Sequence, residues 1–438
     1  MFNFPTPIID NKWLYFWVEL FKKNKDYLAY YINYYNFWRE SQPDFVKDSY
    51  MVNSFDASIG MIERIAKKYD KPEFGIKTII IGDKEHTVTE IEVLHKPFCR
   101  LLHFKKSEQL NHPKMLIVAP LSGHYATLLR GTVRDSLQYF DVYITDWTNA
   151  SEVPLSKGKF DLDDYIYYLN DFIKFLGTNL SVMAVCQPTV PVLASVALLA
   201  AEGNEHVKNM VLMGGPVDAR ASATEVTKFA EKREMNWFES NVITRVPINY
   251  PGFMRAVYPG FIQLAGFMSM NMQRHLGEFM KLYQHLIVGN DDSAEAHIQF
   301  YDEYLSVMDI SAEFYLQTIK TVFKDFALPL GKMYVGNQKV RPEAITNTSL
   351  LVIEGELDDI SGVGQTKAAL KICKNIPQAN THYHLQPGVG HYGVFNGRKF
   401  REQILPVIRD FCYASVNSSN TAKTDNTTKK NINHKKSK

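Results

Sequence analysis

The chain has 438 residues, of which 45% are hydrophobic and 22% are charged, and its formal net charge is +2. These values are ordinary for a soluble globular protein and allow a large core, in one big domain with insertions or in two domains. The small net charge, without a long basic stripe before the extreme C-terminus, argues against a dedicated nucleic-acid binder.

The N-terminus has no basic segment followed by an apolar one, so we expect no signal peptide. No stretch reaches the roughly 18 consecutive apolar residues of a membrane span, so we expect none. The cysteines are few and widely spaced, without a CxxC pair or Cys/His cluster that would suggest a zinc site: Cys99, Cys186, Cys373 and Cys412. Free thiols are typical of a reducing compartment, which predicts a cytoplasmic protein.

Residues 1–75 form an N-terminal segment rich in aromatic side chains, for which we predict helical structure. Within it, residues 11–40 have a helical pattern in which apolar residues cover more than one stripe, interspersed with lysines. Such a helix is either buried on several sides or presents a patch to an apolar phase.

From residue 76 the pattern changes to short strands that alternate with helices. Residues 78–95 alternate like two antiparallel strands joined by a Gly-Asp-Lys turn. Apolar runs predict further strands, and helical patterns lie between them: strands at 115–120, 141–147, 180–186 and 207–215, helices at 160–177 and 192–203. This alternation over residues 76–215 predicts βαβ units and a parallel sheet buried on both faces.

Residues 216–345 interrupt this rhythm with long amphipathic stretches, such as 267–287 and 296–308, which predict an all-helical insertion that caps the strand ends. The βα pattern resumes over residues 346–415, with its own predicted elements: strands at 349–356 and 381–387, helices near 363–374 and 396–413. Residues 416–438 are polar and rich in lysine, and they predict a disordered basic tail.

Ligands of parallel sheets bind at the C-terminal ends of the strands, and three of these ends carry reactive groups. The first is Cys186, which closes an apolar run. Ala184 is small enough for the tight turn of a nucleophile elbow, but Pro188 stands where a glycine is usual. Proline suits the first turn of a helix, and a helix N-terminus favours a thiolate. Pro191 predicts a distorted first turn of this helix. The alternative interpretation of Cys186 is a small residue packed in the core.

The second strand end leads into an acidic loop, where Asp358 and Asp359 are both candidates for an orienting carboxylate and the spacing from the strand favours Asp358. Such a pair is also a common helix cap. The third end leads to His391, in a loop whose glycines let the imidazole swing back over the strand ends. The order cysteine, aspartate, histidine is that of the α/β-hydrolase triad.

An oxyanion hole needs backbone N–H groups beside the nucleophile. The strand at 115–120 runs into a Ser-Gly-His turn before a helix, and we expect the N–H of Gln187 to act with one from Leu121, Ser122 or Gly123. His124 either lines the pocket or is a structural histidine.

Six separated motifs between about residues 80 and 412 resemble the intracellular poly(3-hydroxybutyrate) depolymerases: APLSGHYATLLRGTV, YITDW, VCQPTVP, MGGPVDAR, EGELDDISG and PGVGHYGVFNGRKFR. The resemblance implies an α/β-hydrolase fold, a mostly parallel sheet with helices on both faces and a helical cap insertion. It also implies that Cys186 is the nucleophile, Asp358 the acid and His391 the base of an ester hydrolase that works through a thioester. No metal or organic cofactor is implied, and the partner is the polymer granule in the cytoplasm.

Two other functions remain open. A polyhydroxyalkanoate synthase shares the fold and a catalytic cysteine, but it is expected to carry glycines after the cysteine, where this chain reads AVCQPTV. A non-catalytic granule-binding protein would have no need of all three members of a triad.

Overall fold

The structure is a computed structural model, and it describes residues 34, 37, 39–43, 71–264 and 303–415. The predictions for the aromatic segment before residue 71, for the stretch 267–287 and for the tail 416–438 concern residues that lie outside this description, apart from the few named between 34 and 43.

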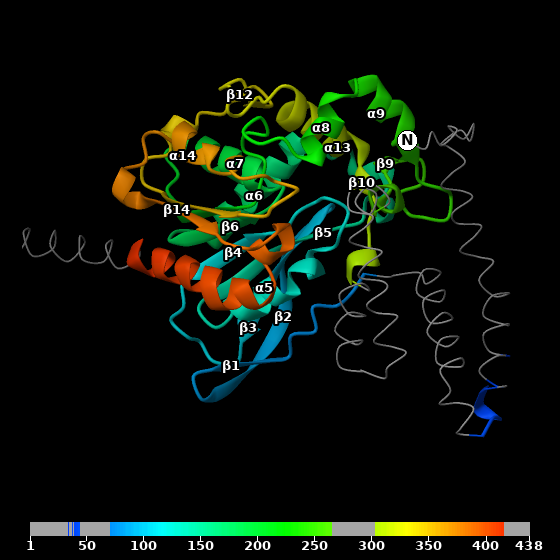
Figure 1. The fold of residues 1–438 in the computed structure, drawn as a ribbon, viewed down its shortest axis with the longest axis horizontal. Coiled ribbons are helices and arrows are strands. Elements are labelled where there is room, and N and C mark those ends of the chain that lie inside the picture. The colour runs from blue at the N-terminus through cyan, green and yellow to red at the C-terminus, as the bar shows by residue number, and fades with distance from the viewer. Residues whose placement is uncertain (1–33, 35–36, 38, 44–70, 265–302, 416–438) are drawn as a thin grey trace, which may run out of the picture.

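A nine-stranded sheet forms the centre of the described chain (Figure 1). In chain order its strands are β1 (Thr78–Ile81), β2 (Lys84–Lys96), β3 (Cys99–Lys106), β4 (Lys114–Val118), β5 (Asp141–Trp147), β6 (Leu180–Val185), β7 (Val207–Met213), β13 (Ser349–Gly355) and β14 (Thr381–Gln386). They lie in the order β1-β2-β3-β5-β4-β6-β7-β13-β14. Neighbours from β5 to β14 are parallel, and β1, β2 and β3 are antiparallel to their neighbours. This is the predicted α/β-hydrolase fold.

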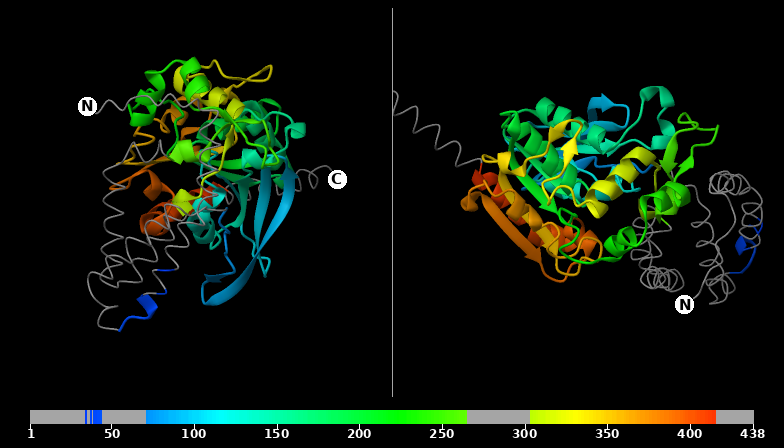
Figure 2. Two further views of the ribbon diagram at one scale, coloured as in Figure 1. Left: turned by 90° about the vertical axis from the view of Figure 1, so that its right-hand side faces the viewer. Right: turned by 90° about the horizontal axis from the view of Figure 1, so that it is seen from above.

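The first two strands form the predicted hairpin, which extends beyond the body of the sheet (Figure 2). Its turn contains Gly82 with φ +62°, a conformation that glycine adopts without strain. Strand β3 was not predicted. Its sequence, CRLLHFKK, has no clean alternation, and its place in the sheet comes from pairing with β2 on one side and β5 on the other.

Helices cover both faces of the sheet. On one face α6 (Leu162–Leu176) and α7 (Thr189–Ala201) pack side by side, and on the other lie α5 (Arg130–Ser136) and the last helix, over residues 405–415 (Figure 1). Two short helices complete the core, α14 (Ala368–Ile372) and α15 (Gly397–Lys399), the latter followed by a π-helical turn at Phe400–Ile404. Helix α6, predicted as part of a helix over 160–177, begins at a capping box between Asp161 and Asp164 and is capped at its end by Gly177.

The insertion over residues 216–345 is not all-helical, so this prediction was wrong for its described part. It contains the helices α8 (Glu225–Glu231), α9 (Met235–Asn241) and α13 (Ala312–Thr318), but also two small sheets, one of β8 (Thr244–Arg245), β9 (Ala256–Tyr258) and β10 (Ile310–Ser311), the other of β11 (Tyr334–Val335) and β12 (Gln338–Lys339). Strands of two or three residues carry no periodic signal. Because Val257 pairs with Ser311, far away in the chain, only tertiary folding forms this sheet.

Arg255 anchors the insertion to the core. It is only 2% exposed, and its guanidinium donates hydrogen bonds to three carbonyl oxygens of the connection between β5 and α6: Val153 at 3.0 Å, Pro154 at 2.7 Å and Gly158 at 2.9 Å. It also lies over the ring of Phe98, 4.9 Å from the centroid. The charge is thus compensated by carbonyl dipoles and an aromatic face.

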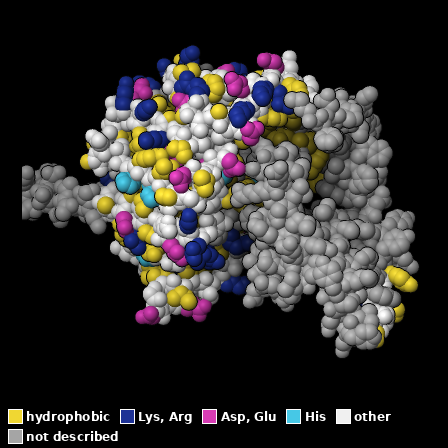
Figure 3. Space-filling view, in the orientation of Figure 1, with side chains coloured by type: hydrophobic (Ala, Val, Ile, Leu, Met, Phe, Trp, Pro, Cys, Tyr) yellow, Lys and Arg dark blue, Asp and Glu magenta, His cyan; other side chains and the backbone are white. Residues whose placement is uncertain are grey.

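The described surface mixes charges of both signs. On the face seen in Figure 3, Lys and Arg side chains are interspersed with Asp and Glu, and hydrophobic side chains line a hollow at the right of the described body. Within the described ranges, no helix combines the length and the apolar character that crossing a membrane requires.

Replacing Arg255 with methionine should lower the free energy of unfolding by about 3 kcal/mol, because three buried carbonyl groups lose their donor. Urea unfolding measures the change. The control is Arg245→Met on the same hairpin, since Arg245 is exposed and donates to the carbonyl of Met254. Equal losses in the two variants would contradict the anchoring role of Arg255.

Candidate active site

Cys186 lies in a sharp turn between β6 and α7. Its backbone has φ +68°, in the left-handed region, where a residue other than glycine is strained by about 1–3 kcal/mol. The N–H of Cys186 donates to the carbonyl of Met213 (2.8 Å), and the Cys186 carbonyl accepts from the N–H of Thr189 (3.1 Å). This is the geometry of a nucleophile elbow, which displays the side chain above the end of its strand.

The two prolines after the cysteine fit the start of α7. Pro188 is the N-cap, with φ −63°, one position before the helix begins. The distorted turn that we predicted from Pro191 is wrong, because the N–H of Val192 reaches the carbonyl of Pro188 at 2.8 Å. Pro191 is the third residue of the helix, and N–H groups at the first positions have no intrahelical acceptor to lose.

His391 and Asp358 form a buried pair. The Nδ1 atom of His391 lies 2.8 Å from Oδ2 of Asp358. The other oxygen of Asp358 accepts the N–H groups of Ile360 (3.0 Å) and Ser361 (2.8 Å), which hold the carboxylate in place. Asp359 is exposed at the same turn. Of the two acids that the sequence left open, Asp358 is therefore the one that meets the imidazole.

The electrostatics of the pair involve Cys186. Burial by itself lowers the pKa of His391, but the charges of Cys186 and Asp358, with hydrogen bonds to both, raise that pKa well above its usual value. A histidine placed between a cysteine and a carboxylate is the arrangement that activates a cysteine as a nucleophile. The structure thus brings Cys186, Asp358 and His391 together from three separate strand ends.

Glu354, which the sequence analysis did not single out, organises the acid loop. It lies in β13 and is fully buried. Its carboxylate accepts the N–H groups of Gly364, Thr366 and Lys367 at 2.8–3.0 Å and the hydroxyl of Tyr383 at 2.9 Å. These bonds hold the loop that carries Asp358. An acidic residue within an apolar strand was the signal available in the sequence.

Two glycines after β7 let this strand approach the site. Gly214 has φ +53°, and a Cβ atom there would lie 3.3 Å from Oδ2 of Asp358. A Cβ atom on Gly215 would come within 2.3 Å of the Cys186 carbonyl oxygen and 2.0 Å of Oγ1 of Thr189. Both belong to the motif MGGPVDAR, in which the sequence analysis assigned no role to individual residues.

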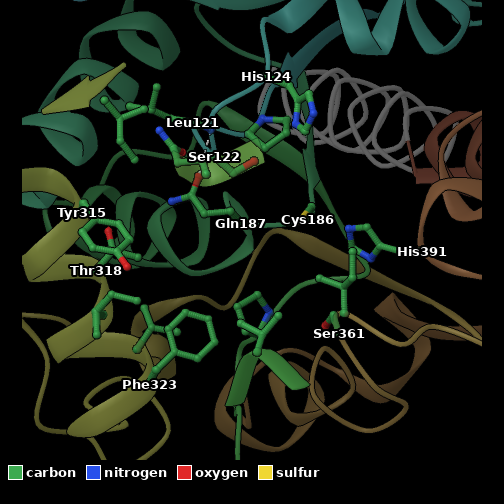
Figure 4. Close-up of a pocket in the computed structure, with 18 of the residues that line it drawn as sticks. Leu121, Ser122, His124, Cys186, Gln187, Tyr315, Thr318, Phe323, Ser361 and His391 are labelled. Atoms are coloured by element: carbon green, nitrogen blue, oxygen red, sulfur yellow. Dashed lines mark hydrogen bonds between the residues drawn. The ribbon is translucent and has the colours of Figure 1, made fainter. Parts of the chain in front are cut away.

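A cavity of about 280 Å³ opens beside Cys186 (Figure 4). The core contributes several of the predicted site residues to its lining: Leu121, Ser122, His124, Cys186, Gln187 and His391. The insertion contributes a largely apolar wall from α13 and the π-helical turn Ile319–Lys324, among them Phe314, Tyr315, Thr318, Ile319, Val322 and Phe323. The cavity is therefore formed where the core meets the insertion.

The predicted oxyanion donors are only partly available. The N–H of Leu121 donates to Oε1 of the Gln187 side chain at 3.2 Å. Gly123 does not line the cavity, and with φ +104° it packs against Gln263, which lies 2.6 Å from where a Cβ atom would stand. Ser122 and Gln187 line the cavity, and the backbone N–H groups of these two residues are the predicted donors that fit the site best.

His124 combines the two roles that the sequence left open. It lines the cavity, and its Nε2 atom lies 3.1 Å from the carbonyl oxygen of Tyr304, in the segment that follows the undescribed part of the insertion. Burial lowers the pKa of His124 to about 4. The imidazole is therefore neutral near pH 7 and donates from Nε2 to the carbonyl.

Cys186→Gly should be more stable to unfolding than Cys186→Ala by about 1 kcal/mol, because only glycine relieves the left-handed strain. Chemical denaturation measures both variants. The matched control is Cys412, buried in the last helix, where Gly should be less stable than Ala by about 1 kcal/mol. The same order of stability at both positions would contradict strain at the elbow.

The pKa of His391 should fall in Cys186→Ala and in Asp358→Asn, because each change removes a negative charge that stabilises the imidazolium. Titration of the histidine resonances by NMR measures it. Asp359→Asn serves as the control, since this acid is exposed and the Nδ1 atom of His391 lies against Asp358 instead. A fall of the same size in the control would mean that the pair is assigned to the wrong carboxylate.

Comparison with solved structures finds distant likenesses. They include a thermophilic esterase from Thermogutta terrifontis (13% identity, 75% of this chain and 99% of that chain, TM-score 0.39) and a monoglyceride lipase from Saccharomyces cerevisiae (11%, 80% and 98%, 0.44). Among curated proteins, none matches the chain. The family described as PHB de-polymerase C-terminus, where PHB is poly(3-hydroxybutyrate), matches residues 214–416, which carry Asp358 and His391. Over these residues the chain resembles the PHB depolymerase family.

Proposed function

We propose that this protein hydrolyses the ester bonds of poly(3-hydroxybutyrate) and releases 3-hydroxybutyrate or short oligomers. The observation that carries the proposal is the family match across the loops of Asp358 and His391, with these two side chains paired next to the strained Cys186. The family match supports an ester hydrolase, and the polymer is the substrate that its description suggests.

In the first half of the reaction, the sulfur of Cys186 attacks an ester carbonyl carbon of the polymer. The negative charge that develops on the carbonyl oxygen is held by the N–H of Gln187 and by a second N–H, for which Ser122 is the best candidate. The carbon–oxygen bond then breaks, and His391 gives its proton to the leaving alcohol oxygen. One polymer fragment departs, and the other stays bound to Cys186 as a thioester.

In the second half, His391 takes a proton from a water molecule as the water attacks the thioester carbonyl. The carbon–sulfur bond breaks, which returns the Cys186 thiolate and releases a carboxylic acid. Asp358 holds the imidazole in the tautomer that presents Nε2 to the reaction, and its charge stabilises the imidazolium in both halves. Neither half requires a metal or an organic cofactor.

We also propose that the protein works on polymer granules in the cytoplasm. Apolar side chains at the tip of the β8–β9 hairpin support contact with a hydrophobic surface. Ile248 is 76% exposed, and Phe253 and Met254 are exposed beside it. Contact with a granule would remove these apolar side chains from water, which is favourable.

Cys186→Ala should lose hydrolysis of amorphous poly(3-hydroxybutyrate) by about 10³-fold or more, because it removes the sulfur proposed to form the acyl intermediate. Release of 3-hydroxybutyrate measures the rate. Cys412→Ala is the control, a buried thiol outside the cavity, and it should retain activity. Undiminished hydrolysis by Cys186→Ala would refute the nucleophile, and polymer formation from hydroxybutyryl-coenzyme A by the wild type would favour a synthase instead.

A further inference from the structure

Two buried polar atoms in the cavity have no hydrogen-bond partner among the described residues. They are Nε2 of Gln187 and Oγ1 of Thr318, and both residues line the cavity beside Cys186. A buried polar group without a partner costs about 1–3 kcal/mol. Of the seven such atoms among the described residues, these two belong to residues that line the cavity, where a bound molecule could supply the missing partner.

The orientation of the Gln187 side chain follows from its neighbour. The N–H of Leu121 can only donate, so the atom it meets at 3.2 Å is the amide oxygen of Gln187. The amide nitrogen, with its two N–H donors, is then the atom of this cavity-lining side chain that has no hydrogen-bond partner among the described residues. The contact with Leu121 thus positions a donor rather than an acceptor.

Thr318 stands on the insertion side of the cavity. It is the last residue of α13, is only 8% exposed, and is surrounded in the cavity wall by apolar groups such as Phe314 and Phe323. The hydroxyl groups of the nearby Tyr315 and Tyr258 bond to each other, so they already have partners. The hydroxyl of Thr318 is therefore the polar group of this wall that lacks one.

The position of Gln187 and Thr318 relative to His391 indicates which part of the ester substrate they would contact. In Figure 4, Gln187 and Thr318 lie on one side of Cys186, and His391 lies on the other. The leaving alcohol oxygen must meet His391, because that oxygen receives the proton. The acyl part of the ester extends from the carbonyl carbon in the opposite direction, toward Gln187 and Thr318.

We infer that Gln187 Nε2 and Thr318 Oγ1 form a subsite for a second oxygen on the acyl unit, the hydroxyl or ester oxygen function at its third carbon. The subsite would let the enzyme prefer 3-hydroxyacyl esters over plain alkanoyl esters of the same length. The inference rests on the proposed attack of Cys186 on an ester. It adds a polar recognition element to an otherwise apolar acyl pocket.

The test compares two soluble esters, p-nitrophenyl 3-hydroxybutyrate and p-nitrophenyl butyrate, by the ratio of their kcat/KM values. The wild type should favour the hydroxylated ester. Thr318→Val keeps the shape of the side chain and should lower the ratio about tenfold, since one hydrogen bond is lost. Gln187→Met should lower it as well. Thermal unfolding of each variant shows that it is folded.

Thr127→Val is the matched control, because Thr127 is also buried with an unpartnered hydroxyl but does not line the cavity. Its ratio should equal that of the wild type. A ratio unchanged by Thr318→Val, including an equal loss on both esters, would overturn the subsite and leave the hydrolase intact. A wild type that cleaves neither ester nor the polymer would overturn the proposed function itself, and the subsite with it.

Discussion

The left-handed backbone of Cys186 is the constraint on which the rest of the site depends. Such a conformation persists in a non-glycine residue only where its surroundings leave no alternative. Here β6 is hydrogen-bonded on both sides, to β4 and β7, and all six of its residues are buried. The carbonyl of Met213 and the first turn of α7 then hold the turn. Gly215 leaves the space that this turn requires.

The acid side of the site is held by a second buried carboxylate. Glu354 gathers backbone N–H groups and a tyrosine hydroxyl, and so fixes the loop in which Asp358 meets His391. In a buried site the charges interact strongly, since little water screens them. The pKa of His391 is raised because its interactions with Cys186 and Asp358 outweigh the effect of burial. Glu354 thus influences the imidazole indirectly, by holding the loop that places Asp358 beside it.

The core and the insertion contribute different properties. The core supplies the reactive side chains at the strand ends, whereas the insertion supplies the wall of the cavity and is tied to the core through Arg255. The wall is largely apolar and includes the unpartnered hydroxyl of Thr318, and the core contributes the side-chain amide of Gln187 to the same cavity. This division places the reactive groups at the strand ends of the sheet and much of the cavity wall in the insertion.

The sequence by itself determined the parallel sheet and the strand ends that carry Cys186, Asp358 and His391, because burial and periodicity are local properties of the chain. Only the tertiary structure decided between Asp358 and Asp359, since it set which carboxylate faces the imidazole. It also formed the two- and three-residue strands of the insertion. The contact of Leu121 with Gln187 and the place of Thr318 were equally unpredictable, because each depends on packing between segments far apart in the chain.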